Sequence, residues 1–385
     1  MVRNMRIFEV IEQSSNLAVP TNRTWLRNLY EPLVDMGHEV VLFPAEEGRA
    51  AMLAHDSKAR ERFSERMVEA FKEEHTRKPF QLAFFYLMDG MFDTWAIDEI
   101  RNVDVPTCNF SCNNIHQFDL VEKISAHFDW NLYAEKDAGN KFRSIGVRAS
   151  WWPMASNPKY FRPVTAQRDI EVSFSGANYG KRLEAIYQLL LNGIGVHVYG
   201  PGWTQNGKRC TRFWALARSM TRALKAVMGS SEDRARYAAQ QSWLSLQCYA
   251  LQRYAENFHE PLTDEDLIAL YSRSTVSLGF LDVLENHDPI GRRLRHMHLR
   301  DFEAPLCGAL YCTDYSDELA EMFEPDKEVI VCHDDIERVD KIRHFLNHPE
   351  QGEKIRQAGR KRALACHTYH RRFETLFALI GLAGR

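Results

Sequence analysis

The chain has 385 residues, of which 45% are hydrophobic and 26% charged, and its formal net charge is −3. A single core rarely grows beyond roughly 250–300 residues, so this length predicts two globular domains. The small net charge provides no basic field for nucleic acid, and we expect no nucleic-acid partner. The sequence has no stretch of about 18 uncharged apolar residues, which argues against a membrane-spanning helix.

Eight cysteines are scattered along the chain without any CxxC pair, which gives little support to a zinc or dithiol site. The apolar run that follows Arg6 is short and is interrupted by Glu9 and Glu12, so it is too short and too acidic for a secretory signal. We therefore expect a cytoplasmic protein with reduced cysteines.

The first part of the chain alternates short apolar runs with helical patterns. Helices are predicted at 22–36 and 64–74. Strands are predicted at 6–10, 39–43, 81–88, 105–110, 130–133 and 147–152. Strands that alternate with helices favour parallel pairing with right-handed crossovers. Residues 1–157 are therefore predicted to form an N-terminal Rossmann-like domain.

Pro158 and Pro163 interrupt this alternation and indicate a linker. A second Rossmann-like domain is predicted at 164–366, with a long helical insertion at about 203–261 and a C-terminal helix at 367–385 that returns to the first domain or stays apart. Its predicted strands are at 170–174, 196–199, 275–280, 309–312 and 328–331, and its predicted helices at 181–191, 264–272 and 300–307. Such α/β domains bind ligands outside the carboxyl ends of their strands.

Arg300 and Glu303 lie three positions apart in a predicted helix, so both can occupy one helical face. A carboxylate in this position can accept hydrogen bonds from two ribose hydroxyls, and a guanidinium can meet a phosphate with fixed geometry. The alternative is an ordinary ion pair on the surface of a capped helix.

The segment 174–182 follows a predicted strand and opens a helix. Gly176 lets the backbone come close to a diphosphate, and Lys181 and Arg182 add positive charge beside the helix N-terminus. Gly200, in the turn after the next strand, is a further candidate for nucleotide contact. The alternative is that both segments are simple turns.

The motif at 300–310, Arg-Asp-Phe-Glu-Ala-Pro-Leu-Cys-Gly-Ala-Leu, resembles the R-x-F-E-x-P-A-C-G-A motif of the CgeB-like glycosyltransferases. Segments that resemble further motifs of this family follow in the same order, at 322–328, 344–349 and 367–369. The resemblance covers roughly 148–373. It implies a GT-B fold, in which Glu303 binds the donor ribose and Arg300 lies beside the phosphates.

The same resemblance implies a reaction. A sugar would pass from a UDP-, GDP- or dTDP-sugar to an acceptor bound by the N-terminal domain, and that acceptor could be a glycan, a lipid-linked molecule or a protein. No cofactor or metal is expected. The D-x-D pattern at 264–266 follows Thr263 and suits a helix start better than a metal site.

This sequence departs from related enzymes at two places. Arg295 stands where the E-x7-E pattern of retaining GT-B enzymes has its first glutamate, so no catalytic glutamate is carried over there. His296 and His298 are then candidates to touch the donor, or are ordinary surface histidines. An acidic pair expected after the fourth strand is replaced by amides, which leaves His116 and Asp119 as candidates for a catalytic base or as helix caps. Retention and inversion both stay open.

Two further expectations concern the acceptor and the membrane. Asn22, Arg23 and Asp89 are candidates for the acceptor side, because they follow strands in the N-terminal half. The segment 212–228 has the pattern of a basic amphipathic helix. Such a helix can lie on the inner face of an anionic membrane or pack its apolar side on the domain.

Two other functions compete with transfer. The first is a GT-B nucleotide-sugar epimerase, for which no clear set of converging carboxylates and a histidine is found. The second is a nucleotide-sugar-binding protein that has lost catalysis, which the missing acidic pair and the missing first glutamate would explain.

Overall fold

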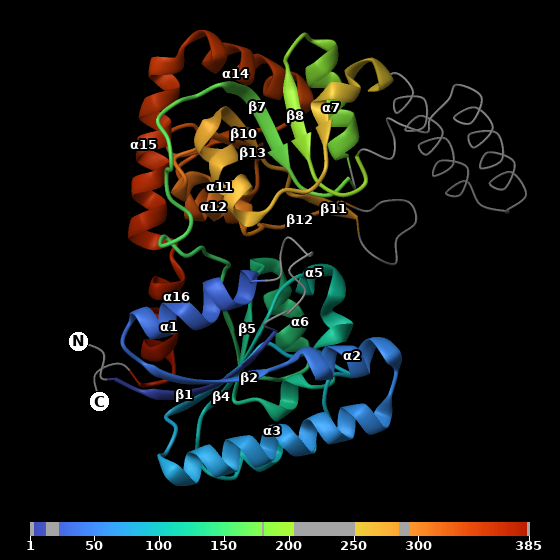
Figure 1. Ribbon diagram of the computed structural model, residues 1–385, viewed down its shortest axis with the longest axis vertical. Coiled ribbons are helices and arrows are strands. Elements are labelled where there is room, and N and C mark those ends of the chain that lie inside the picture. Colours follow the sequence, from blue (N-terminus) through green and yellow to red (C-terminus); the bar gives the residue numbers. More distant parts are fainter. Residues whose placement is uncertain (1–3, 13–22, 179–180, 204–250, 285–292, 383–385) are drawn as a thin grey trace, which may run out of the picture. The chain divides into compact units, whose positions relative to one another are not determined.

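The computed structural model describes residues 4–12, 23–178, 181–203, 251–284 and 293–382. The chain divides into an N-terminal unit, Met1–Asn157 with Cys366–Arg385, and a C-terminal unit, Pro158–Ala365. Each unit is a six-stranded parallel sheet with helices packed against it (Figure 1). The predicted α/β class with two parallel sheets is confirmed.

The N-terminal sheet has the order β2-β1-β3-β4-β5-β6, and all its neighbouring strands are parallel. Each of the six strands predicted in this half is present. Their bounds are β1 Arg6–Ile11, β2 Glu39–Pro44, β3 Leu82–Phe85, β4 Thr107–Ser111, β5 Trp130–Tyr133 and β6 Ala149–Trp151.

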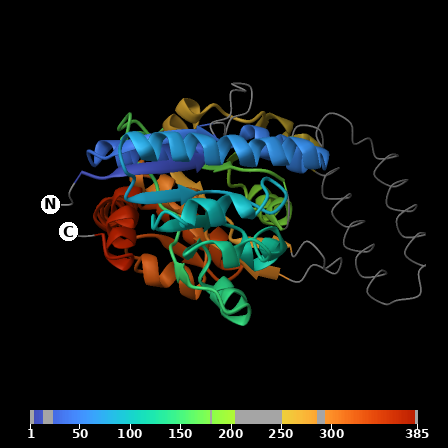
Figure 2. The same cartoon turned by 90° about the horizontal axis from the view of Figure 1, so that it is seen from below.

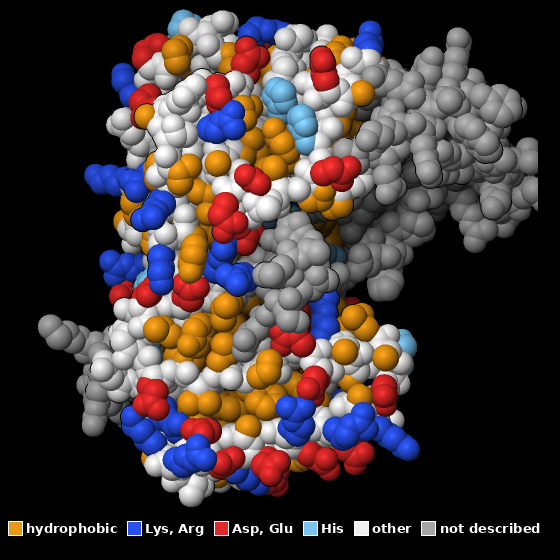
Figure 3. All heavy atoms as spheres, in the orientation of Figure 1, with side chains coloured by type: hydrophobic (Ala, Val, Ile, Leu, Met, Phe, Trp, Pro, Cys, Tyr) orange, Lys and Arg blue, Asp and Glu red, His pale blue; other side chains and the backbone are white. Residues whose placement is uncertain are grey.

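The longest helix of the N-terminal unit is α3, Ser57–Arg77, which runs along one face of the sheet (Figures 1 and 2). It begins at Asp56, whose side chain accepts the Ala59 amide at 3.0 Å, and it buries Phe71 edge-on against Phe8 of β1. Its outer face mixes acidic and basic side chains, as Figure 3 shows. The other helices are α1 Glu31–Asp35, α2 Glu46–Ala54, α4 Trp95–Arg101, α5 Asn114–Gln117, α6 Gly139–Ser144 and α16 Tyr369–Leu379.

The C-terminal helix α16 belongs to the N-terminal unit and is tied to the end of β6. The buried guanidinium of Arg372 donates to the carbonyls of Pro153, Met154 and Cys366, at 2.7, 3.1 and 3.0 Å. The indole of Trp152 donates back to the Arg372 carbonyl at 2.8 Å. A buried cation needs such hydrogen bonds, so this arrangement fixes the place where the chain re-enters the unit.

The C-terminal sheet has the Rossmann order β14-β13-β10-β7-β8-β9 and is also parallel. Its strands are β7 Ile170–Ser175, β8 Val196–Tyr199, β9 Phe258–His259, β10 Ser274–Leu278, β13 Tyr311–Asp314 and β14 Ile330–Cys332. Its helices include α7 Arg182–Leu191, α11 Asp264–Arg273, α12 Arg300–Leu306, α13 Asp317–Met322, α14 Asp335–Asn347 and α15 Pro349–Cys366. The order reverses between β7 and β10, where open α/β sheets place their ligands.

Two elements of the C-terminal unit differ from the sequence-based expectation. The strand β9 lies inside the range predicted as an insertion, yet it is the edge strand beside β8. A two-stranded hairpin, β11 Asp282–Leu284 and β12 Arg293–Arg295, precedes α12 and was not predicted. Its strands have three residues each, too few to show a period.

Several expectations fall outside the described residues, namely the basic segment 212–228, most of the predicted insertion, and Asn22. Among the described helices, none is long and apolar enough to cross a membrane. The predicted cap of α11 is confirmed, because the Thr263 hydroxyl accepts the Asp266 amide at 3.1 Å.

Glu9 is a buried acid in the middle of β1, paired in register with Leu42 and Phe84. Neither of its carboxyl oxygens has a hydrogen-bond partner among the described residues. Burial raises the pKa of Glu9 well above its usual value. The protonated form is therefore favoured more strongly in the folded chain than in the unfolded chain, where the carboxyl ionises above about pH 4.5.

We expect Glu9→Gln to stabilise the protein at neutral pH. The folded-state pKa is raised, so the carboxyl lowers stability progressively as pH rises above about 4.5, and the amide removes this term. Denaturant unfolding should show a gain on the order of 2 kcal/mol at pH 7 that shrinks toward pH 4.5. Glu73→Gln on the exposed side of α3 is the control. A variant less stable than the parent at every pH would contradict this interpretation.

Candidate functional site

Two glycine turns lie backbone against backbone at the carboxyl ends of β7 and β8. The Gly176 amide donates to the Tyr199 carbonyl at 2.8 Å, and the indole of buried Trp203 donates to the Gly176 carbonyl at 2.7 Å. Gly200 has φ of +142°, and a Cβ on it would lie 2.3 Å from the Gly176 oxygen. Glycine at 200 is therefore required both by its conformation and by the close approach of the two turns.

Arg182 and Arg300 both lie over the ring of Phe174, with each guanidinium carbon 5.4 Å from the ring centroid. Arg182 begins α7 and also donates to the Ala177 carbonyl at 3.0 Å. A Cβ on Gly176 would lie 2.7 Å from Nη2 of Arg300, so the space of the missing side chain admits this guanidinium. Two positive charges are thus fixed beside the turn that opens α7.

Asp301 holds the start of α12 in place. Its carboxylate accepts the His298 amide at 2.6 Å and the Tyr311 hydroxyl from β13. A Cβ on Gly279 would lie 1.8 Å from that hydroxyl oxygen, so the glycine after β10 leaves space for the tyrosine. Burial raises the pKa of Asp301 to about 6, and the two hydrogen bonds lower it. The first turn of α12, which carries Arg300 and Glu303, is therefore held in place by the hydrogen bonds of Asp301.

The Glu303 side chain is 8% exposed and follows Arg300 by one helical turn. Burial raises its pKa to about 8, Arg300 lowers it, and Asp264 and Asp301 raise it further. Asp264 is the first residue of α11, so the starts of α11 and α12 both contribute to the field at this carboxyl. Among the described residues, no hydrogen bond occupies the Glu303 carboxyl. Its oxygens are available to accept from a ligand.

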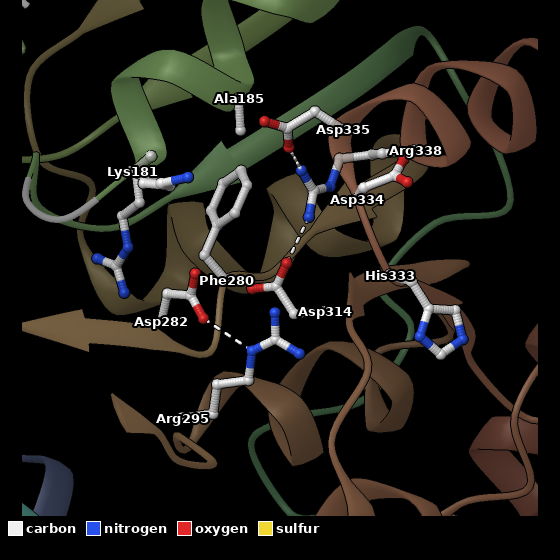
Figure 4. A pocket seen from close by; sticks show the side chains of 11 residues that line it. Lys181, Ala185, Phe280, Asp282, Arg295, Asp314, His333, Asp334, Asp335 and Arg338 are labelled. Carbon is white, nitrogen blue, oxygen red and sulfur yellow. Dashed lines mark hydrogen bonds and ion pairs between the residues drawn. The ribbon is translucent and has the colours of Figure 1, made fainter. Parts of the chain in front are cut away.

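Beside this arrangement, a small cavity of about 140 Å³ opens between the starts of α7 and α14 and the ends of β10, β13 and β14 (Figure 4). Arg182 belongs to both places, because it contacts Phe174 and also lines the cavity. The lining consists of Lys181, Arg182, Ala185, Phe280, Asp282, Arg295, Asp314, His333, Asp334, Asp335 and Arg338. Charged side chains dominate this list.

The structure brings Gly176, Arg182, Gly200 and Arg300 together, with Glu303 one turn away and Lys181 in the adjoining cavity. His298 lies in the segment before α12. Its amide donates to Asp301, and its ring lies 4.3 Å from that of buried His296. All the residues predicted to bind the donor therefore lie at the carboxyl edge of the C-terminal sheet, as its topology requires.

In the N-terminal unit, His116 lies on the short helix α5, and Asp119 is exposed in the following 3₁₀ turn, Phe118–Leu120. Neither side chain caps α5. Glu135, which follows β5, instead accepts the amides of Asn113 and Asn114 at 2.6 and 2.9 Å. Burial raises the pKa of Glu135 to about 7, and these backbone hydrogen bonds lower it. A carboxyl thus holds the loop that lacks the expected acidic pair.

The described acceptor-side candidates are Arg23 and Asp89. Arg23 is exposed at the start of the helical segment that leads into α1. Asp89 follows β3, and its carboxylate forms an ion pair with Lys123 at 3.3 Å. Its amide donates to the Leu120 carbonyl at 2.7 Å, which brings it to the segment that carries Asp119.

Sequence reasoning missed the residues that position the site, above all Phe174, the Tyr311–Asp301 hydrogen bond and Glu135. The resemblance that identified Arg300 and Glu303 gave no indication of their partners, because these come from other strands. Only one signal in the sequence could have indicated such a partner. The x of the R-x-F-E motif is Asp301, an acidic residue among apolar residues of a predicted helix, which suggests that it has a hydrogen-bond partner.

Two Rossmann-like units with parallel sheets, the second carrying glycine turns, two fixed guanidinium groups and a buried glutamate at its carboxyl edge, define a GT-B protein of the glycosyltransferase class. The chain belongs to the family described as "Glycosyl transferase-like", whose profile matches residues 181–378. No curated protein matches the chain.

Solved structures of low sequence identity share the fold. A glycosyltransferase from Rickettsia africae has a TM-score of 0.60 at 9% identity, with 99% of each chain covered. Sucrose-phosphate synthase from Thermosynechococcus elongatus has a TM-score of 0.58 at 13% identity, with 98% of this chain and 99% of that chain covered. Anabaena HepE in complex with UDP and glucose has a TM-score of 0.55 at 10% identity, with 98% and 100% covered.

We expect Gly200→Ala to destabilise the C-terminal unit and to weaken nucleotide binding, because the new Cβ would clash with the Gly176 carbonyl. Denaturant unfolding should show a loss on the order of 2–4 kcal/mol. Gly193→Ala is the matched control, since Gly193 has φ of +76° but no atom within 4 Å of an added Cβ. It should lose only about 1 kcal/mol and bind nucleotide normally. Equal losses in both variants would show that the packing of the two turns is unimportant.

Proposed function

We propose that the protein transfers a sugar from a nucleotide-sugar donor to an acceptor that is a glycan, a lipid-linked molecule or a protein, as in the CgeB-like enzymes that its motifs resemble. One observation carries the proposal. A single turn of α12 brings Arg300 against Gly176 at the end of β7 and leaves the carboxyl of Glu303 open to a ligand.

In this proposal, Glu303 accepts hydrogen bonds from the two ribose hydroxyls. Arg300, Arg182 and Lys181, together with the start of α7, stabilise the negative charge that develops on the leaving diphosphate. HepE and an α-glucosyltransferase of the same fold were both solved with UDP, which makes UDP the first nucleotide to test, before GDP and dTDP.

Transfer breaks the bond between the anomeric carbon and the donor phosphate oxygen and forms a bond to an acceptor hydroxyl, whose proton must be taken up. We propose His116 as the group that takes it, because an imidazole can act as a base near neutral pH. His116→Asn should then abolish turnover of the donor while UDP affinity stays unchanged. Asp119→Asn, on the exposed turn that follows, should keep activity. The opposite pattern would assign the base to Asp119.

Glu303→Gln tests the nucleotide site. We expect calorimetric titration with UDP to show a loss of about 1.5–3 kcal/mol, because a charged acceptor of ribose hydroxyls is removed. The free protein should become more stable, since the pKa of Glu303 is raised to about 8 and the buried acid costs on the order of 2 kcal/mol at pH 7. Glu350→Gln on α15 is the exposed control. Unchanged affinity for UDP, GDP and dTDP alike would refute the site.

Nucleotide binding should also depend on pH. The raised pKa means that Glu303 is mostly protonated at pH 7 and ionised above about pH 8, and the ionised form is the better acceptor. UDP affinity should therefore rise about threefold to tenfold between pH 7 and pH 9, as the protonated fraction falls. In Glu303→Gln the affinity should stay flat over this range. A parent protein without this rise would show that the carboxylate does not bind the ribose.

A further inference from the structure

The cavity beside Arg182 is lined by four acids and four cations, and most of these charges are matched within the protein. Asp314 accepts the Leu281 amide at 2.8 Å and the guanidinium of Arg338, and Asp335 accepts from the same guanidinium. Figure 4 shows these acids converging on Arg338 at one side of the cavity.

The other two acids are also engaged. Asp334 caps α14 by accepting the Glu337 amide at 2.8 Å, and Asp282 accepts Nε of Arg295 at 2.8 Å. The starts of α7 and α14 both face the cavity, and each contributes positive partial charge. Each acid thus has a partner within the protein, whereas two of the cations keep N–H donors that no described residue accepts.

Two of the cations have N–H donors that no described residue accepts. Arg295 is fixed on β12 by Asp282 and by the Tyr315 carbonyl, which Nη1 reaches at 2.7 Å. Its Nη2 makes no further hydrogen bond to the described residues. The ammonium of Lys181, at the start of α7, likewise has no hydrogen-bond partner among them. A guanidinium held by two of its nitrogens keeps the third oriented, which suits a carboxylate or phosphate oxygen.

The diphosphate already has cations of its own, since Arg182 and Arg300 are fixed at the Gly176 turn. Arg295 therefore adds an oriented N–H donor beyond those at the Gly176 turn, in the same segment that leads into α12. We propose that this cavity receives the sugar of the donor and that Arg295 binds a carboxylate on it, so that the donor is a nucleotide-activated uronic acid. This inference rests on the proposed function.

The test compares donors that differ only at C6 of the sugar. Calorimetric titration of the full chain with UDP, UDP-glucose and UDP-glucuronate should show about tenfold tighter binding of the uronate than of the neutral sugar, because a charge-assisted hydrogen bond is added. Where GDP or dTDP binds in place of UDP, the same comparison uses glucose and glucuronate on that nucleotide.

Arg295→Gln should remove the preference for the uronate and leave the affinity for UDP unchanged. Lys181→Gln leaves the β11–β12 hairpin intact and removes a cation that the proposed function places at the diphosphate, so it should weaken UDP, UDP-glucose and UDP-glucuronate alike and keep the preference for the uronate. Arg343→Gln, a surface arginine paired with Asp340, is the control and should behave like the parent. Circular dichroism establishes that each variant is folded.

Three outcomes overturn the inference. Equal binding of UDP-glucose and UDP-glucuronate by the parent would refute it and leave the proposed function standing. A loss of UDP affinity in Arg295→Gln equal to its loss of uronate affinity would assign Arg295 to the diphosphate instead. A parent that binds none of the three nucleoside diphosphates would refute the proposed function, and this inference with it.

Discussion

The approach of the Arg300 guanidinium to Gly176 is the contact on which the candidate site depends. A Cβ at 176 would lie 2.7 Å from Nη2 of Arg300, so the guanidinium would have to shift away from the end of β7. Phe174 supports the guanidinium from the side, and Gly200 lets the second turn lie against the first. The site is therefore built by leaving out side chains at two positions, which brings backbone and charge closer than ordinary residues allow.

This arrangement carries a cost in stability. Asp301 and Glu303 lie in the same short helix, and burial raises the pKa of both carboxyls, to about 6 and about 8. Asp301 recovers part of the cost through Tyr311 and the His298 amide, which fix the start of α12. Glu303 recovers part of it from the charge of Arg300, but no hydrogen bond from the described residues reaches its carboxyl. A buried acid without a hydrogen-bond partner is costly in a folded chain, and the ribose hydroxyls of the proposed donor would supply the missing hydrogen bonds.

Most elements of the fold could be predicted from local sequence patterns. The residues proposed to bind the nucleotide-sugar donor could be predicted from motifs. The six strands of the N-terminal sheet have apolar runs of four or more residues or follow clear turn residues, and α3 has its apolar face and its cap in its own sequence. The β11–β12 hairpin could not be found in this way, because each of its strands has only three residues and is defined by pairing with the other. The edge strand β9 has only two residues and is defined by its neighbour β8.

The residues that form hydrogen bonds to the candidate site could not be predicted from the sequence, for a different reason. The residues that follow parallel strands lie at one edge of the sheet. A functional group that is missing after one strand can therefore be supplied by a residue that follows the neighbouring strand. The amides at Asn113 and Asn114 suggested a loop without a carboxyl, yet Glu135 from the neighbouring strand binds both of their backbone amides. Tyr311 reaches Asp301 in the same way, from β13 into α12. A motif consists of residues that are close in sequence, whereas the hydrogen bonds that fix this site join residues from different strands. Which strand ends lie together is known only from the order of strands in the sheet.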